Sequence, residues 1–148
     1  MSLAMISISR FARDFGKSCV SELRLRPAIL LIFIVMTDCL FCKIIAGSIP
    51  SKKVYEDEKA FAFEDIKPVA PTHVLIIPKK HIVGIDQATE ADAELVGYCQ
   101  LVAAKIARER KLEHGFRTVY NVGPDAGQTV FHLHLHLLGG RQMHWPPG

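Results

Sequence analysis

The chain has 148 residues, of which 49% are hydrophobic and 22% are charged, a composition typical of one globular domain with a hydrophobic core. The formal net charge of +3 lies in the first 35 residues, which hold five basic and two acidic side chains. The remaining sequence is balanced in charge, so we expect no basic surface for a nucleic-acid backbone and no nucleic-acid partner.

Residues 1–36 differ from the rest, because they are basic and end in the apolar run of residues 28–36. That run is shorter than the roughly 20 apolar residues needed to cross a bilayer. It fits a signal peptide or an organelle-targeting segment, although no small-residue cleavage site follows it. Alternatively, Met36 is the natural start, or the segment is a folded appendage. We expect a cytoplasmic protein with one domain over residues 37–148, organelle-targeted or membrane-associated if residues 1–36 are a genuine presequence.

Within this domain, β-branched and aromatic segments separated by turn residues predict strands on both sides of one helix. The expected strands cover residues 53–56, 59–63, 73–77, 116–121 and 129–138. The proline-containing residues 65–71 and the glycine-containing residues 123–127 predict loops. This order indicates an α+β domain with a mostly antiparallel sheet.

The helix is expected to open at Thr89, a favourable N-cap residue followed by Glu90 and Asp92 in the first turn. Apolar residues then recur at helical spacing, at Leu95, Val96, Cys99, Val102, Ala103 and Ile106. The basic segment of residues 108–111 follows them. The pattern predicts a long helix with one buried face.

The segment FHLHLHLLGG, residues 131–140, places histidines at alternate positions of the last expected strand. Because side chains alternate between the faces of a strand, His132, His134 and His136 should share one face. The intervening leucines should face the core. Packing alone does not require three adjacent imidazoles, and two functions fit them. One is a metal site, for which zinc is the natural candidate, and the other is nucleophilic catalysis at phosphorus.

The loop that leads into these histidines, residues 121–129, contains two glycines and three neutral polar side chains, Asn121, Gln128 and Thr129. Glycines allow backbone amides to approach an anion closely. A hairpin turn has a similar composition. Beside the histidines, however, the loop favours phosphorus chemistry over metal-dependent hydrolysis.

The motif HLHLHLL, residues 132–138, matches the signature of the histidine triad (HIT) family, and the chain resembles that family from residue 38 to residue 148. Residues 38–82 resemble the N-terminal half of its members, and the tail GGRQMHWPPG is similar to the Hint branch. The resemblance implies a HIT-like fold, with a mostly antiparallel five-stranded sheet, one long helix and a shorter one. It also implies a homodimer in which the two sheets join.

The resemblance further implies a purine nucleotide substrate and hydrolysis of nucleoside 5′-phosphoramidates and acyl-adenylates. No cofactor is required for catalysis in that scheme. Two other functions stay open: a nucleotide-binding regulatory or adaptor protein with incidental hydrolysis, and a zinc-dependent hydrolase that uses the three histidines as ligands. The intact set of catalytic residues favours the enzyme.

By position in the family, the catalytic residues would have separate roles. His134 would attack the α-phosphorus and form a nucleotidyl-histidine. His136 would contact the phosphate and assist proton transfer, and His132 would orient the nucleophile. His73 would complete the proton relay, because the leaving amine must be protonated.

The nucleotide would be bound by residues from several segments. Asp65 would accept hydrogen bonds from the ribose, and Trp145 would approach the partner's active site. Phe41, Ile66 and Leu75 would line the purine pocket. The phosphate or the leaving group would be contacted by Asn121, Gly127, Gln128 and Thr129, together with His134 and His136.

A separate prediction concerns Cys39 and Cys42, whose spacing suits a metal pair or a redox pair. Some members of the family hold a structural zinc with such a pair and two histidines. Here these histidines would be His81 and His132, which complete a plausible tetrahedral site. The alternative is two reduced, partly buried cysteines without a metal.

Overall fold

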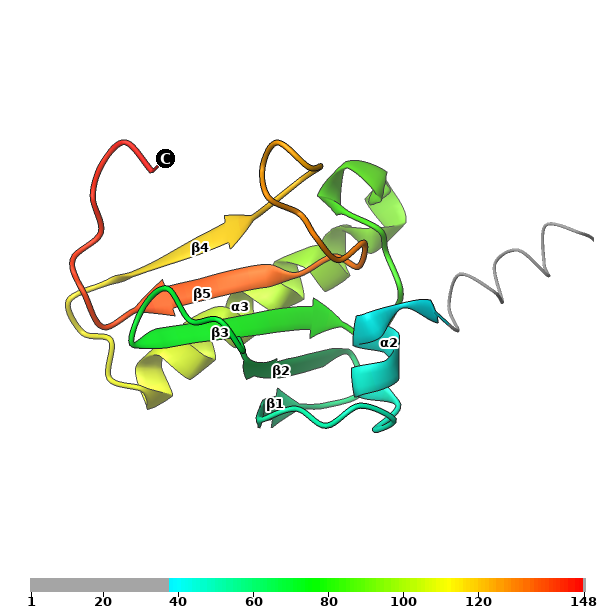
Figure 1. The fold of residues 1–148 in the computed structure, drawn as a ribbon, viewed down its shortest axis with the longest axis horizontal. Helices are drawn as coiled ribbons and strands as arrows, with labels where there is room; N and C mark the ends of the chain where they lie inside the picture. Colours follow the sequence, from blue (N-terminus) through cyan, green and yellow to red (C-terminus); the bar gives the residue numbers. More distant parts are fainter. Residues whose placement is uncertain (1–37, 148) are drawn as a thin grey trace, which may run out of the picture.

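The computed structural model describes residues 38–147, which form a five-stranded antiparallel sheet with helices on both faces (Figure 1). The predictions for residues 1–36 lie outside the described residues. Along the chain, the elements are α2 (Leu40–Ile45), β1 (Lys53–Glu56), β2 (Ala60–Glu64), β3 (Thr72–Pro78), α3 (Ala93–Glu109), β4 (Phe116–Tyr120) and β5 (Leu135–Gly139). Two short 3₁₀ helices, Ile85–Gln87 and Glu90–Asp92, precede α3.

The strand order is β1-β2-β3-β5-β4, so β5 lies between β3 and β4. Its residue Leu135 pairs with Ile76 of β3 on one side and with Tyr120 of β4 on the other. The expected α+β class, five-stranded antiparallel sheet, long helix and shorter helix are all confirmed. No helix within residues 38–147 is long and apolar enough to cross a membrane.

The two faces of the sheet are buried against different elements. One face packs on the long helix α3, whose apolar stripe meets Ala62, Val74 and Leu137. The other face packs on α2, where Phe41 and Ile44 close over an apolar cluster with Phe61, Phe63, Leu75 and Ile77. Because side chains alternate along β3 and β5, His73 and His136 lie on the α2 face, opposite α3.

The prediction that the last strand runs over residues 129–138 is wrong at its beginning, because β5 starts only at Leu135. On one side β4 ends at Tyr120, the partner of Leu135; on the other side β3 continues two residues past Ile76, the partner of Leu135, but pairs there with β2 and not with β5. The preceding backbone bonds to a loop instead, and the N–H of Leu133 donates to the carbonyl of Ile82. His132 and His134 therefore lie in irregular backbone before the strand, and only His136 lies within it.

The helix prediction from Thr89 is confirmed with one difference in its first turn. Thr89 caps a 3₁₀ turn, Glu90–Asp92, and the α-helix proper begins at Ala93. A reciprocal capping box joins Thr89 and Asp92, whose carboxylate accepts the Thr89 backbone N–H at 3.0 Å. This arrangement satisfies backbone donors that a helix N-terminus leaves free.

Candidate functional site

A backbone group selects one tautomer of the neutral His134 ring. Its Nδ1 donates a hydrogen bond of 2.7 Å to the carbonyl oxygen of His132, an acceptor that requires the proton on Nδ1. The neutral ring then carries its lone pair on Nε2, the nitrogen available to a substrate. The ring lies beside that of His136, with 5.0 Å between the centroids. Irregular backbone before β5 thus presents an oriented nucleophilic nitrogen.

A chain of hydrogen bonds runs through His73 and His136. The backbone N–H of Val69 donates to Nδ1 of His73 at 3.3 Å, which places the proton of this neutral ring on Nε2. That nitrogen lies 2.9 Å from Nδ1 of His136 and donates to it. The proton of the neutral His136 ring is consequently on Nε2, which lies 3.5 Å from the side-chain amide of Asn121; a hydrogen bond there requires the amide to present its oxygen rather than Nδ2 to the ring. These hydrogen bonds fix which nitrogen of each neutral ring carries its proton.

The imidazoles of this relay are held in their neutral form. Burial, together with His134 and His73, lowers the pKa of His136 to about 4. Burial also lowers the pKa of His73, while the nearby carboxylate of Asp65, with 3.4 Å between Oδ2 and Nε2, opposes that shift. An anionic phosphate among these rings would raise their pKa values and favour transfer of a proton to a leaving group.

The loop expected to hold phosphate folds over the histidines with glycines at positive φ, namely Gly123 at 74° and Gly127 at 80°. The buried side chain of Gln128 organises it. Its Oε1 accepts the N–H of Gly123 at 2.9 Å, and its Nε2 donates to the carbonyl of Val83 at 2.8 Å. The structure therefore places Gln128 inside the loop, with both amide groups bonded to protein, while Thr129 is exposed.

The expected purine and ribose residues divide into buried and exposed members. Phe41 and Leu75 are 4% and 6% exposed and belong to the apolar cluster beneath the histidines. Ile66 is 91% exposed, on the loop after β2. Beside it, Asp65 accepts the N–H of Lys67 through Oδ1 at 2.7 Å, so Oδ2 faces His73. This Oδ2 is the atom that ribose hydroxyls could reach.

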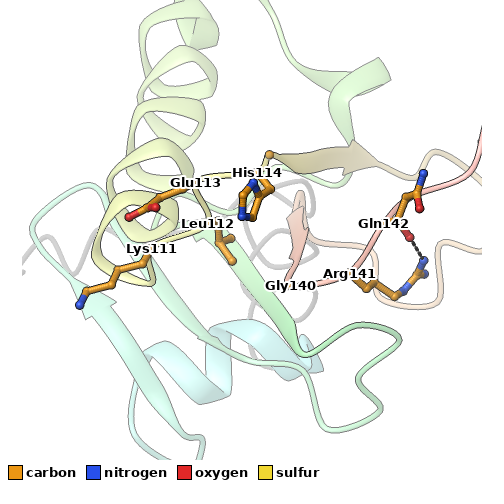
Figure 2. A pocket seen from close by; sticks show the side chains of 8 residues that line it. Lys111, Leu112, Glu113, His114, Gly140, Arg141 and Gln142 are labelled. Atoms are coloured by element: carbon orange, nitrogen blue, oxygen red, sulfur yellow. Dashed lines mark hydrogen bonds between the residues drawn. The ribbon is translucent and has the colours of Figure 1, made fainter.

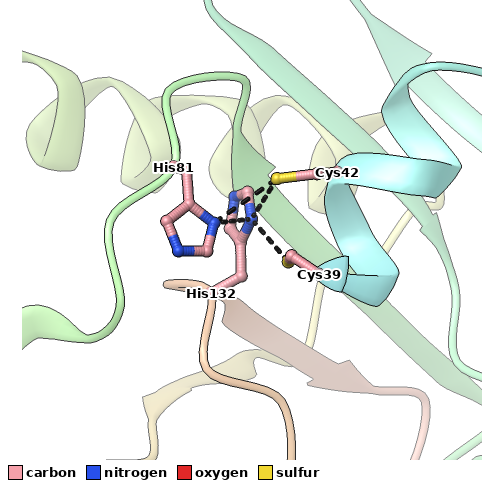
Figure 3. Close-up of side chains that lie close together, drawn as sticks. All are labelled: Cys39, Cys42, His81 and His132. Atoms are coloured by element: carbon pink, nitrogen blue, oxygen red, sulfur yellow. Dashed lines mark hydrogen bonds between the residues drawn. The ribbon is translucent and has the colours of Figure 1, made fainter. Parts of the chain in front are cut away.

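Cys39, Cys42, His81 and His132 converge from three segments, as Figure 3 shows. Nδ1 of His132 lies 3.5 Å from Sγ of Cys39 and 3.6 Å from Sγ of Cys42. Nδ1 of His81 lies 3.4 Å from Sγ of Cys42 and 3.2 Å from Nδ1 of His132. The predicted metal set is thus brought together in space.

These separations fit a tetrahedral zinc ion. Zinc bond lengths imply about 3.3 Å between two nitrogen ligands and about 3.5 Å between nitrogen and sulfur. His132 donates from Nε2 to the carbonyl of Pro78 at 2.9 Å, which leaves the lone pair of Nδ1 directed at the cluster. Burial and the neighbouring Cys39 raise the pKa of Cys42 to about 11, so a bound cation is needed for its thiolate to form at neutral pH.

A second group of possible ligands, Asp65, His73 and His136, is better described as part of the hydrogen-bond relay. A metal at Nε2 of His73 would move the proton of the neutral ring to Nδ1. That nitrogen already accepts the Val69 N–H, so the two protons would face each other. The three triad histidines also do not converge on one metal, because Nδ1 of His132 and Nδ1 of His134 have different partners.

A cavity of about 340 Å³ lies away from the histidines, between the segment after α3 and the segment after β5 (Figure 2). It is lined by residues 111–115 and 140–142. None of the predicted catalytic, nucleotide-binding or metal residues lines it. It therefore plays no part in the site built by the histidines.

Comparison with known proteins agrees with this architecture. Residues 46–143 match the model of the HIT domain. The 14 kDa zinc-binding protein of Zea mays is 54% identical over 111 residues, covering 74% of this chain and 87% of that protein. The same search found an uncharacterized HIT-like protein of Synechococcus elongatus that is 50% identical, covering 75% of this chain and 97% of that protein.

Solved structures share the fold as well. A HIT family hydrolase of Legionella pneumophila superposes with a TM-score of 0.74 at 54% identity, covering 75% of this chain and all of that one. A histidine triad nucleotide-binding protein of Candida albicans superposes with a TM-score of 0.63 at 36% identity, covering 73% and 82% of the two chains. With the sheet, the triad and the preceding loop in place, this chain belongs to the histidine triad (HIT) family.

Proposed function

We propose that the protein hydrolyses the P–N bond of purine nucleoside 5′-phosphoramidates, and acyl-adenylates, through a nucleotidyl-His134 intermediate. The observation that carries this proposal is the hydrogen bond from Nδ1 of His134 to the carbonyl of His132, which leaves Nε2 as a nucleophile. The same bond stabilises the positive charge that the ring gains when Nε2 bonds to phosphorus. Neighbours named HIT family hydrolase support the reaction class.

In this mechanism, Nε2 of His134 attacks the α-phosphorus as the bond to the leaving nitrogen breaks. With the phosphate bound, the raised pKa lets the ring of His136 carry a second proton; the ring then gives Nε2–H to the leaving nitrogen and returns to its neutral form, while His73 beside it holds the ring in place. Water then attacks the nucleotidyl-histidine, returns a proton to the relay and releases the nucleoside monophosphate. Phe41 and Leu75 support the purine, and Asp65 holds the ribose.

The test is release of AMP from adenosine 5′-phosphoramidate by the full chain, with and without chelator. We expect activity in both conditions and a loss on the order of 10⁴-fold or more in His134→Ala, because the covalent route disappears. His114→Ala is the matched control, since this exposed histidine lies outside the site. Activity that survives in His134→Ala would remove the nucleophile role, and AMP binding without hydrolysis would indicate the adaptor function.

We also propose that Cys39, Cys42, His81 and His132 hold a structural zinc ion. The ion would link α2 to the segment after β3 and to the segment before β5. The name of the Zea mays relative supports zinc binding in the family. The tetrahedral fit of the four ligand atoms supports it at these residues.

Metal analysis of the purified chain should return one zinc per molecule, and chelator should lower the melting temperature by about 5 °C or more. Cys42→Ser should lose the metal, whereas Cys99→Ser, which changes a cysteine of α3 buried in the core away from the cluster, should retain it. Protein that contains no zinc and melts unchanged in chelator would contradict the proposal.

A further inference from the structure

One residue, His132, belongs to both the cysteine cluster and the histidine site. Its Nδ1 faces the sulfur atoms of Cys39 and Cys42, and its Nε2 donates to the carbonyl of Pro78. Its own carbonyl oxygen accepts the Nδ1 proton of His134. The side chain has no exposed surface, so these contacts have no water to replace them. The position of His132 therefore depends on the cysteine cluster, and His132 in turn sets the orientation of His134.

A second contact joins the same two centres. Phe41 lies between the two cysteines in the sequence and is 4% exposed. Its ring meets the rings of His132 and His134 edge-on, with centroid distances of 5.9 Å and 5.3 Å. A metal that draws Cys39 and Cys42 together would therefore also fix the aromatic ring packed against the nucleophile.

We infer that metal occupancy of the cluster positions the His134 ring, and that the metal and a purine nucleotide consequently bind with positive coupling. Without the metal, His132 loses the partner of Nδ1, and the first turn of α2 loses its link to the segment before β5. His134 then samples orientations in which Nε2 is turned away from the phosphate. Only the identity of the nucleotide rests on the proposed function, because the positioning of His134 is a property of the fold.

Coupling of this kind is reciprocal, because each ligand favours the same arrangement of shared groups. The metal should tighten AMP binding by about tenfold, within the usual range for coupled sites. AMP should tighten binding of Co²⁺, a zinc substitute whose sulfur ligands give it a visible spectrum, by the same factor. Neither measurement depends on turnover of a substrate.

The direct test observes the Nδ1 proton of His134 by nuclear magnetic resonance of the full chain labelled with ¹⁵N-histidine. The signal is assigned by its absence in His134→Ala. With Zn²⁺ bound, the proton should be protected from exchange by the carbonyl of His132. In the metal-free chain it should broaden or vanish while the amide signals of β2 and β3 remain, and added Zn²⁺ should restore it.

AMP affinity is then measured by calorimetry in both metal states and in two variants of α2. Cys42→Ser should weaken AMP binding about as much as chelation does. Leu40→Ala is the matched control, because Leu40 lies between the same cysteines with 42% of its surface exposed and is not part of the apolar cluster that holds Phe41. Its AMP and Co²⁺ affinities should equal those of the unmodified chain.

A His134 signal and an AMP affinity that are the same with and without metal would overturn the inference, even if the chain hydrolyses phosphoramidates. Global unfolding of the metal-free chain at the assay temperature would also overturn it, since the metal would then support the whole fold. If instead hydrolysis is absent but the signal and affinity follow the metal, the positioning role stands and the proposed reaction fails.

Discussion

The surroundings of His136 determine both the charge of its ring and the position of its proton. Burial among His73 and His134 keeps the imidazole neutral, while the bond from His73 fixes which of its nitrogens carries the proton. A neutral donor beside the loop that we propose to hold phosphate suits a site in which the substrate brings the negative charge. The ring is therefore prepared to deliver its proton only after the phosphate has arrived.

Because the pKa of His136 is lowered in the folded chain, the free energy of unfolding depends on pH. The unfolded chain binds a proton near pH 6.5, whereas the folded chain does so only near pH 4. The stabilising contribution is complete above the unfolded value and is lost as the pH falls through this window, because the unfolded state then binds more protons. The free energy of unfolding is measured with denaturant, in chelator, at about pH 7.5 and about pH 5. It should fall more between these two pH values for the unmodified chain than for His136→Gln. Equal losses would show that His136 does not carry the effect.

At the residue scale, spacing alone placed His134 beside His136, and the family resemblance assigned different roles to the three histidines. The sequence does not predict which nitrogen of each ring carries the proton, because backbone groups decide it. Nδ1 of His73 is set by the N–H of Val69, and Nδ1 of His134 by a carbonyl. Any residue type supplies those groups, so no side-chain pattern marks them.

At the element scale, helix and strand positions followed from periodicity, whereas the beginning of β5 did not. Histidines and leucines alternate unchanged from residue 132 to residue 137, across the start of β5, so the sequence contains no sign of this boundary. The boundary comes from β4, which ends at the partner of Leu135, and from the loop at Ile82, whose carbonyl accepts the N–H of Leu133 in place of a ladder bond. The length of β5 is therefore decided by neighbouring segments.

The cap of α3 is an element whose contribution can be measured directly. Thr89→Ala removes the hydroxyl of the capping box and should lower the free energy of unfolding by about 1 kcal/mol. Thr89→Ser keeps the hydroxyl and should retain most of the stability in the same denaturant titration. A serine variant as unstable as the alanine variant would show that the hydroxyl is not the stabilising group.

At the scale of the whole molecule, we expect a homodimer formed through β4, which among the strands of residues 38–147 has only β5 as a neighbour. Phe116 at the start of this edge strand is 44% exposed. Unpaired backbone groups and apolar side chains on a sheet edge favour pairing with a second copy. The two sheets would then continue into one another.

Light scattering of the full chain should give twice the mass of the 16.5 kDa protomer. Phe116→Glu should shift the equilibrium toward the monomer, because it puts a charge on the pairing edge. Lys53→Glu, a charge change on the opposite edge strand β1, is the control and should leave the dimer intact. A monomeric unmodified chain would contradict this arrangement.

The position of β5 also determines the order in which the protein can fold. It is the last strand of the sheet along the chain, yet it lies between β3 and β4, which are formed from earlier residues. Until β5 is synthesised, the apolar edge of β3 has no partner and β4 is not attached to the sheet. Long-range pairing of this kind is slow and leaves strand edges open to aggregation. During synthesis, one edge of β3 therefore stays unpaired until the segment that carries His136 inserts and completes the sheet.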